Sequence, residues 1–140
     1  MTAIGFRRGV LAVIVVLWVV SLALPAVRAG AAPALTGLDV LLRGWRAFEF
    51  GVYAWFANPA FLTAVVLGGM RRYAAASVLA GVGCVLALTS FAAGGIAASA
   101  GTPVPEPAML AGFYGWLASQ FALLACCARW AARTRDAVER

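Results

Sequence analysis

The side chains that could do chemistry in this sequence are few and widely spaced. The chain has no histidine, and its five carboxylates are Asp39, Glu49, Glu106, Asp136 and Glu139. Metal centres need clustered His, Cys or carboxylate ligands, and acid–base catalysis needs titratable groups within reach of one another. We therefore expect no catalytic residue, no metal site and no bound cofactor, and we predict that the chain is not an enzyme.

Three cysteines are the other reactive groups. Cys84 lies within a long apolar stretch, and the adjacent pair Cys126 and Cys127 lies near the end of another. The sequence contains no C-x-x-C motif, so thiol–disulfide exchange is not expected. We interpret the three cysteines as small apolar packing residues.

Uncharged polar side chains give better candidates for a site. Asn58, Ser90, Ser119 and Gln120 interrupt apolar stretches, and Pro59 directly follows Asn58. We predict that these five residues form a polar cluster buried among helices. Two interpretations of the cluster stay open: hydrogen bonds that hold helices together, or a polar pocket or narrow pore.

Pro59 gives the most informative local signal. It has no N–H to donate to the carbonyl of Trp55, and a nearby amide such as that of Asn58 can occupy the freed carbonyl. We expect a kinked but continuous helix here. The alternative, in which Asn58 caps a new helix that starts at Pro59, leaves a helix too short to cross a bilayer.

The overall composition predicts the surroundings of these residues. Of the 140 residues, 64% are hydrophobic and 11% are charged, and the mean hydropathy is +0.95. A water-soluble chain of this size needs more polar surface to cover its core, whereas a lipid bilayer requires none. The composition therefore predicts an integral membrane protein.

Four charge-poor stretches are long enough to cross a bilayer, which takes about 20 residues. Within a single transmembrane domain, 1–140, the predicted spans are 9–27, 50–70, 74–97 and 109–128. Segment 101–107, with three prolines, is predicted to be the hairpin loop between the last two spans. We expect an all-α fold without strands: an integral membrane four-helix bundle, close-packed through small residues, with aromatic residues such as Trp55 and Trp116 at headgroup level.

The arginines predict the orientation. Eight of the eleven precede the first span, separate the second from the third, or follow the fourth. The positive-inside rule therefore places both termini, the Arg71–Arg72 turn and the tail 129–140 in the cytoplasm, with the chain in a bacterial inner membrane. The net charge of +6 is spread over helix ends and forms no single stripe, so no nucleic-acid partner is expected.

A cleaved signal peptide is the alternative for the first segment. Arg7 and Arg8 precede its apolar run, and Ala29-Gly30-Ala31 resembles a cleavage site. The apolar run is longer than the about 7–15 residues of a usual signal peptide, which favours a retained helix. Both interpretations of the first segment stay open.

Segment 35–48, between the first two spans, is predicted to be a short extracytoplasmic amphipathic helix. Its apolar residues recur at helical spacing, and Asp39 and Arg43 are spaced to form an i,i+4 ion pair on the polar face. One interpretation is a helix that lies on the membrane surface, with Trp45 among the headgroups. The other is a face for a partner, formed by Leu41 and Trp45.

One stretch of the sequence resembles a known pattern. It runs from Gly44-Trp45 to Ala54-Trp55-Phe56-Ala57-Asn58-Pro59 and is followed by a basic turn. It is similar to a pattern in small uncharacterised bacterial membrane proteins. The resemblance implies a bacterial membrane setting; it implies no activity and no functional residue.

Two functional hypotheses follow from these observations. The first is a non-catalytic accessory or structural component of the membrane, which presents its outer helix to a partner, either another membrane protein or a second copy of the chain. The alternative is a homo-oligomeric small transporter or channel with Asn58 and Gln120 along its pathway. The predicted spans hold no carboxylate, so such a transporter would not be driven by an intramembrane carboxylate.

Overall fold

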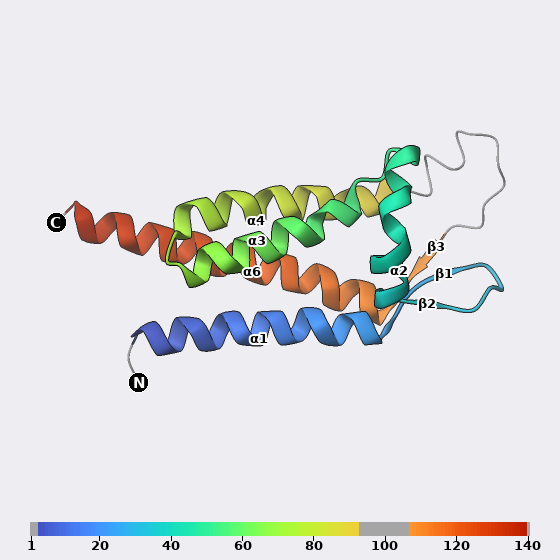
Figure 1. The fold of residues 1–140 in the computed structure, drawn as a ribbon, viewed down its shortest axis with the longest axis horizontal. Coiled ribbons are helices and arrows are strands. Elements are labelled where there is room, and N and C mark those ends of the chain that lie inside the picture. Colours follow the sequence, from blue (N-terminus) through green and yellow to red (C-terminus); the bar gives the residue numbers. More distant parts are fainter. Residues whose placement is uncertain (1–2, 93–106, 140) are drawn as a thin grey trace.

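The computed structural model describes residues 3–92 and 107–139. Four α-helices run alongside one another to form an elongated bundle (Figure 1): α1 Ala3–Ala23, α3 Ala57–Gly69, α4 Tyr73–Leu88 and α6 Ala111–Val138. Figure 1 shows both ends of the chain at one end of the bundle, which we call the termini end. The opposite end carries the strands, and we call it the sheet end.

Three helical segments are long and apolar enough to cross a membrane: Gly5–Ala23, Tyr73–Phe91 and Ala111–Ala137. The expectation of a mostly helical protein is therefore confirmed, and three of its helices have the length and composition that a membrane crossing needs. The predicted second span, 50–70, differs, because its apolar helix covers only Ala54–Gly69. Gly51 has a left-handed backbone, with φ of 74°, and separates this helix from the preceding turn.

The segment that follows α1 is not one regular amphipathic helix. The structure divides it into strand β2 Leu35–Thr36, helix α2 Gly37–Arg43 and the 3-10 helix η1 Gly44–Phe50, and a further 3-10 turn, η2 Ala54–Phe56, leads into α3. Figure 1 shows α2 lying across the bundle axis at the sheet end. The change from 3.6 to 3.0 residues per turn at Gly44 alters which side chains share a face.

Thr36 and Asp39 start helix α2 as a capping box. The Thr36 hydroxyl accepts a 3.2 Å hydrogen bond from the Asp39 N–H, and the Asp39 carboxylate accepts a 3.0 Å bond from the Thr36 N–H. These hydrogen bonds hold the pKa of the Asp39 carboxyl below its usual value. The predicted Asp39–Arg43 ion pair is not formed in the described structure, because the carboxylate turns back to Thr36.

A small antiparallel sheet is the largest departure from the predicted all-α fold. Its strands β1 Pro25–Ala29, β2 and β3 Pro107–Met109 lie in the order β2-β1-β3, and Val27 pairs with Met109. Helix α1 ends at Ala23, before Pro25, so residues 24–27 of the predicted first span leave the helix. Of the predicted hairpin loop 101–107, only Pro107 belongs to the described residues, and residues 93–97 of the predicted third span also lie outside them.

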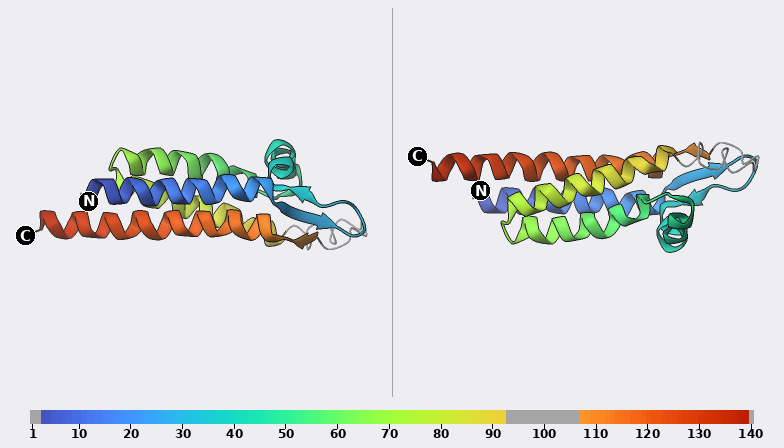
Figure 2. Two further views of the ribbon diagram at one scale, coloured as in Figure 1. Left: turned by 90° about the horizontal axis from the view of Figure 1, so that it is seen from below. Right: turned by 90° about the horizontal axis from the view of Figure 1, so that it is seen from above.

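The core lies along the middle of the bundle. Helix α1 packs mainly against α6, and α4 packs against both α3 and α6; Figure 2 shows α1 and α6 side by side in both views. Leu11, Ile14 and Trp18 form one buried face of α1, and the Trp18 ring stacks on Phe61 of α3 with 5.8 Å between ring centroids. Fully buried alanines such as Ala64 let the helices approach closely.

The turn between α3 and α4 is held by backbone hydrogen bonds. The Arg71 N–H donates to the Gly68 carbonyl at 3.1 Å, and the Arg72 N–H donates to the Leu67 carbonyl at 2.9 Å. This is the Schellman pattern, in which the residue after the helix adopts a left-handed backbone. Arg71 takes that position with φ of 63°, where glycine is the favoured residue.

Candidate binding site at the sheet end

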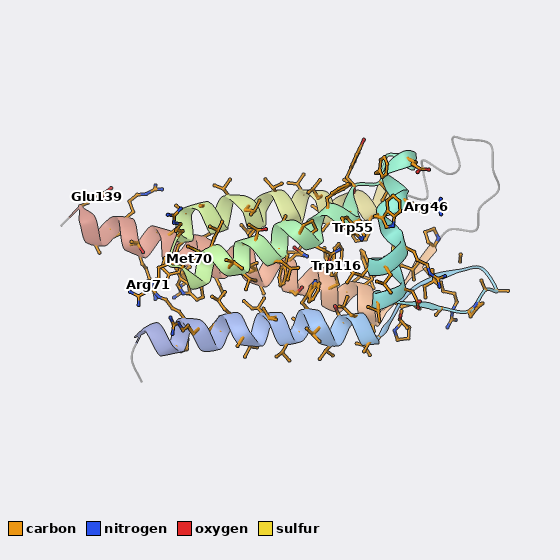
Figure 3. All side chains as sticks on the ribbon, in the orientation of Figure 1. Arg46, Trp55, Met70, Arg71, Trp116 and Glu139 are labelled. Carbon is orange, nitrogen blue, oxygen red and sulfur yellow. The ribbon has the colours of Figure 1, made fainter. Side chains whose placement is uncertain are left out.

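The Asn58 side chain joins three helices near the sheet end. Its Oδ1 atom accepts hydrogen bonds from the indole N–H groups of Trp116 on α6, at 2.8 Å, and of Trp18 on α1, at 3.3 Å. Its Nδ2 atom donates to the Trp55 carbonyl at 3.0 Å. Asn58 is only 7% exposed. We call Asn58, Trp18, Trp55 and Trp116 the Asn58 node; Figure 3 labels Trp55 and Trp116 in the half of the bundle nearer the sheet.

The hydrogen bond between Asn58 and Trp55 is the contact that Pro59 leads us to expect. The Trp55 carbonyl lies four residues before Pro59, so in a regular helix it would receive the N–H that proline lacks. The chain passes from the 3-10 turn η2 into α3 at this point without leaving helical structure. The amide of Asn58 therefore completes the local hydrogen bonding and holds the node in place.

The predicted polar cluster is only partly assembled. Asn58 and Ser90 both line one cavity, whereas Ser119 and Gln120 do not line it and Pro59 is exposed. Both serine hydroxyls donate to the carbonyl three residues earlier in the chain, at 2.7 Å for Ser90 and 2.6 Å for Ser119. These serines are therefore satisfied locally and do not link helices.

Gln120 is the least satisfied polar group of the cluster. It is 1% exposed, and its Nε2 atom finds no hydrogen-bond partner among the described residues. The side chain lies against Gly83 of α4, where a Cβ atom would stand 3.3 Å from Gln120 Oε1. Gln120 is thus buried against α4 and contributes nothing to the node.

The two tryptophan donors are the functional residues that the sequence interpretation missed. Trp116 was expected at headgroup level, and Trp18 was not singled out. A signal was present, because a tryptophan within an apolar span carries an N–H that needs an acceptor. Asn58 and Gln120 are the one Asn and the one Gln of the chain, so they were the natural acceptors to test.

A cavity of about 240 Å³ lies at the sheet end, and Asn58, Trp55 and Trp116 of the node form part of its wall. All of its lining residues are uncharged and most are apolar. They come from the end of α1, from β1 and β3, from α2 and η1, from the segment 52–58, from η3 (Thr89–Ala92) and from the start of α6. Leu41, Val52, Trp55, Phe113 and Trp116 are among them. Asn58, Ser21 and Ser90 are polar members of the lining. We call this space the apolar cavity.

Helix α2 covers the apolar cavity and is tied down on two sides. The Trp55 indole N–H donates a 2.6 Å hydrogen bond to the Leu41 carbonyl, and the Gly37 N–H donates to the Leu24 carbonyl at 3.0 Å. A Cβ atom at Gly37 would lie 2.6 Å from the Ser21 carbonyl oxygen, so glycine is needed for this close approach.

The two residues of the predicted partner face are separated by the structure. Leu41 is half-buried and lines the apolar cavity, whereas Trp45 on η1 is 47% exposed. The regular helix on which the prediction rested ends between them, at Arg43. Leu38 and Leu42 of α2 are exposed, as is Trp45 of η1.

The described residues offer binding chemistry at this site. Within residues 3–92 and 107–139, no group of three or more His, Cys, Asp or Glu side chains is arranged to hold a metal ion. The cysteines are free, with Cys84 and Cys127 buried. The Asn58 nitrogen carries a second hydrogen, for which the described residues provide no acceptor. An apolar group with one hydrogen-bond acceptor would match this cavity.

Comparisons of the chain with protein-family models, with curated proteins and with solved structures give no match.

Proposed function

We propose that this chain is a non-catalytic binding protein of the membrane, which holds a small apolar group in the apolar cavity. The observation that carries the proposal is the cavity itself, an uncharged and mostly apolar space of about 240 Å³ with an amide in its wall. Ligand sites are typically apolar with a few polar groups that fix orientation. An apolar cavity of about 150 Å³ is enough to bind benzene, so the proposed ligand is a ring or a short chain that carries one carbonyl.

The membrane setting supports the choice of an apolar ligand. Large apolar residues stand on the outside of the helices: Val13, Val78 and Val85 are 69%, 70% and 67% exposed. A surface of this kind is stable in lipid, where apolar molecules are concentrated. A ligand that partitions into the bilayer would reach the cavity from its surroundings.

The proposal includes four membrane crossings and an orientation. The segment Ala54–Gly69, which comprises η2 and α3, would be the second crossing along the chain and the shortest of the four, about 24 Å long at 1.5 Å per residue. Helices α2 and η1 precede this segment and would lie at its outer end. The arginines at the termini end support a cytoplasmic position for both termini in a bacterial inner membrane, and the apolar cavity would then face the outer leaflet.

The transporter alternative draws less support from the geometry. A pathway between copies of the chain would need polar groups on the protomer surface. Asn58 and Gln120 are 7% and 1% exposed, and Asn58 Oδ1 is occupied by two indole donors. These two residues are therefore better suited to the interior of one bundle than to a symmetric pore.

Native mass spectrometry of the protein, gently extracted from its own membranes, tests the proposal. We expect a small non-covalent mass on the wild type. The variant Val52→Phe, which fills the cavity, should lose that mass, and Val66→Phe, which adds the same ring to a residue 59% exposed on α3, should keep it. If both variants keep the small mass, the ligand does not occupy the cavity and the proposal is contradicted. A protein subunit that copurifies in fixed ratio with both variants, in place of a small mass, would also contradict it.

A further inference from the structure

A second cavity lies at the termini end, where the α3–α4 turn faces α6. Its volume is about 530 Å³. Three arginines line it, Arg71 and Arg72 from the turn and Arg135 from α6, together with Tyr73, Thr134 and several alanines. We call it the arginine cavity; Figure 3 labels Arg71 at this end of the bundle.

The positive charge of the arginine cavity is not neutralised by the protein. Among the described residues, no carboxylate lies within 4.0 Å of the guanidinium groups of Arg71, Arg72 or Arg135. Asp136 on α6 and Glu139 directly after that helix do not line the cavity. Three arginines that line one hollow, without a carboxylate among the lining residues, favour an anion with several oxygen atoms.

The surrounding groups add to the positive potential. Arg72 stands at the N-cap of α4 and supplies no side-chain hydrogen bond to its first turn, whose residues line the cavity. The N–H groups of a first helical turn favour negative charge. The Arg7 guanidinium lies 5.0 Å from the centre of the Tyr73 ring, which places a fourth positive charge beside the cavity.

The position of the arginine cavity relative to the bilayer indicates the source of the anion. Tyr73 is the first residue of a segment, Tyr73–Phe91, that is long enough to cross the bilayer, so its first turn stands at headgroup level. Basic pockets between transmembrane helices are known sites for anionic headgroups. We propose that the arginine cavity binds the phosphate group of an anionic membrane lipid. The positive-inside rule alone requires arginines on this side of the membrane but does not require three of them around one hollow.

Lipid titration followed by native mass spectrometry tests this assignment. The probes are phosphatidylglycerol and phosphatidylcholine with identical acyl chains, so that net headgroup charge is the principal difference. We expect tighter binding of phosphatidylglycerol to the wild type and an about fivefold loss of that affinity in Arg135→Gln. Arg133→Gln, two residues away on the same helix and outside the cavity lining, is the matched control and should stay near the wild type.

The outcomes separate a specific site from general attraction. Equal losses in Arg135→Gln and Arg133→Gln, or equal affinity for the two lipids, would overturn the proposal. If Arg135→Gln does not fold, Arg72→Gln on the opposite wall provides the same test with the same expected loss. Displacement of phosphatidylglycerol by millimolar inorganic phosphate would overturn the lipid as the source of the anion; we expect no displacement.

Discussion

The indole N–H of Trp116 donates a 2.8 Å hydrogen bond to the side-chain oxygen of Asn58, which joins α6 to α3 across 58 positions of the sequence. The same oxygen accepts the indole N–H of Trp18 on α1 at 3.3 Å. A buried N–H without an acceptor is costly, so both bonds strongly favour one arrangement of the three helices. That arrangement forms the floor of the apolar cavity.

Replacement of Asn58 by leucine should destabilise the bundle. Asn58→Leu leaves the indole N–H groups of Trp18 and Trp116 without an acceptor, and we expect the free energy of unfolding to fall by about 1–3 kcal/mol. Gln120→Leu is the matched control, because it removes a buried amide whose nitrogen has no partner. Unfolding in mixed detergent micelles measures both. Equal losses in the two variants would contradict a special role for the Asn58 node.

The Asn58 node shows which site contacts the sequence could predict. The bond from Asn58 to the Trp55 carbonyl follows from the N–H that Pro59 lacks, and that argument needs only neighbouring residues. The bonds from Trp18 and Trp116 depend on how α1 and α6 are rotated toward α3, which no local pattern specifies. Hydropathy predicts that these helices exist; it does not predict which faces meet.

The small sheet was not predicted, because it too depends on contacts between distant parts of the chain. Strands β1, β2 and β3 have five, two and three residues, too few for an alternating pattern to be recognised. Val27 pairs with Met109 from a distant part of the chain, so the pairing depends on how α1 and α6 are placed and not on a local pattern. The long apolar helices were predictable because each coincides with a long apolar stretch that carries few charges.

Gly112 should be sensitive to the addition of a single methyl group. A Cβ atom there would lie 2.6 Å from the Leu24 carbonyl oxygen, so Gly112→Ala must push α6 away from the end of α1. We expect a loss of about 1–3 kcal/mol in the free energy of unfolding. Gly9→Ala, where a Cβ atom meets nothing within 4 Å, should leave it unchanged or slightly higher. A harmless Gly112→Ala would show that this contact is not tight in the membrane.

The capping box predicts a dependence on pH in acid. Because its hydrogen bonds to Thr36 lower the pKa of Asp39 from 3.8, the carboxylate stabilises the fold above the unfolded-state pKa. That stabilisation is lost as the pH falls through the lower folded-state pKa. The difference in unfolding free energy between the wild type and Asp39→Asn should therefore be constant near neutrality and shrink below about pH 4. A Thr36→Ala background removes the hydroxyl but keeps the backbone N–H of residue 36, so the difference should become smaller there. A difference of unchanged size would exclude the Thr36 hydroxyl as a cause.

The left-handed backbone of Arg71 predicts a stabilising substitution. Glycine adopts φ of 63° without the steric penalty of a Cβ atom, so Arg71→Gly should raise the free energy of unfolding by up to about 1 kcal/mol. Arg72→Gly removes the same charge at φ of −84°, where glycine relieves no strain, and should give no gain. Thermal unfolding of the two variants in one detergent compares them. A gain of equal size in both would point to charge removal and not to backbone strain.

The central claim, that the apolar cavity binds a ligand, is tested most directly by tryptophan fluorescence, because Trp55 and Trp116 line it. The probe is para-bromoacetophenone, a ring with one carbonyl and a bromine atom that quenches indole emission; para-bromoethylbenzene is the probe of similar shape without the carbonyl. We predict saturable quenching by the ketone in the wild type and in Val66→Phe, weaker binding of the ethyl compound, and only a linear partitioning response in Val52→Phe. Identical linear curves for all three proteins would contradict the claim.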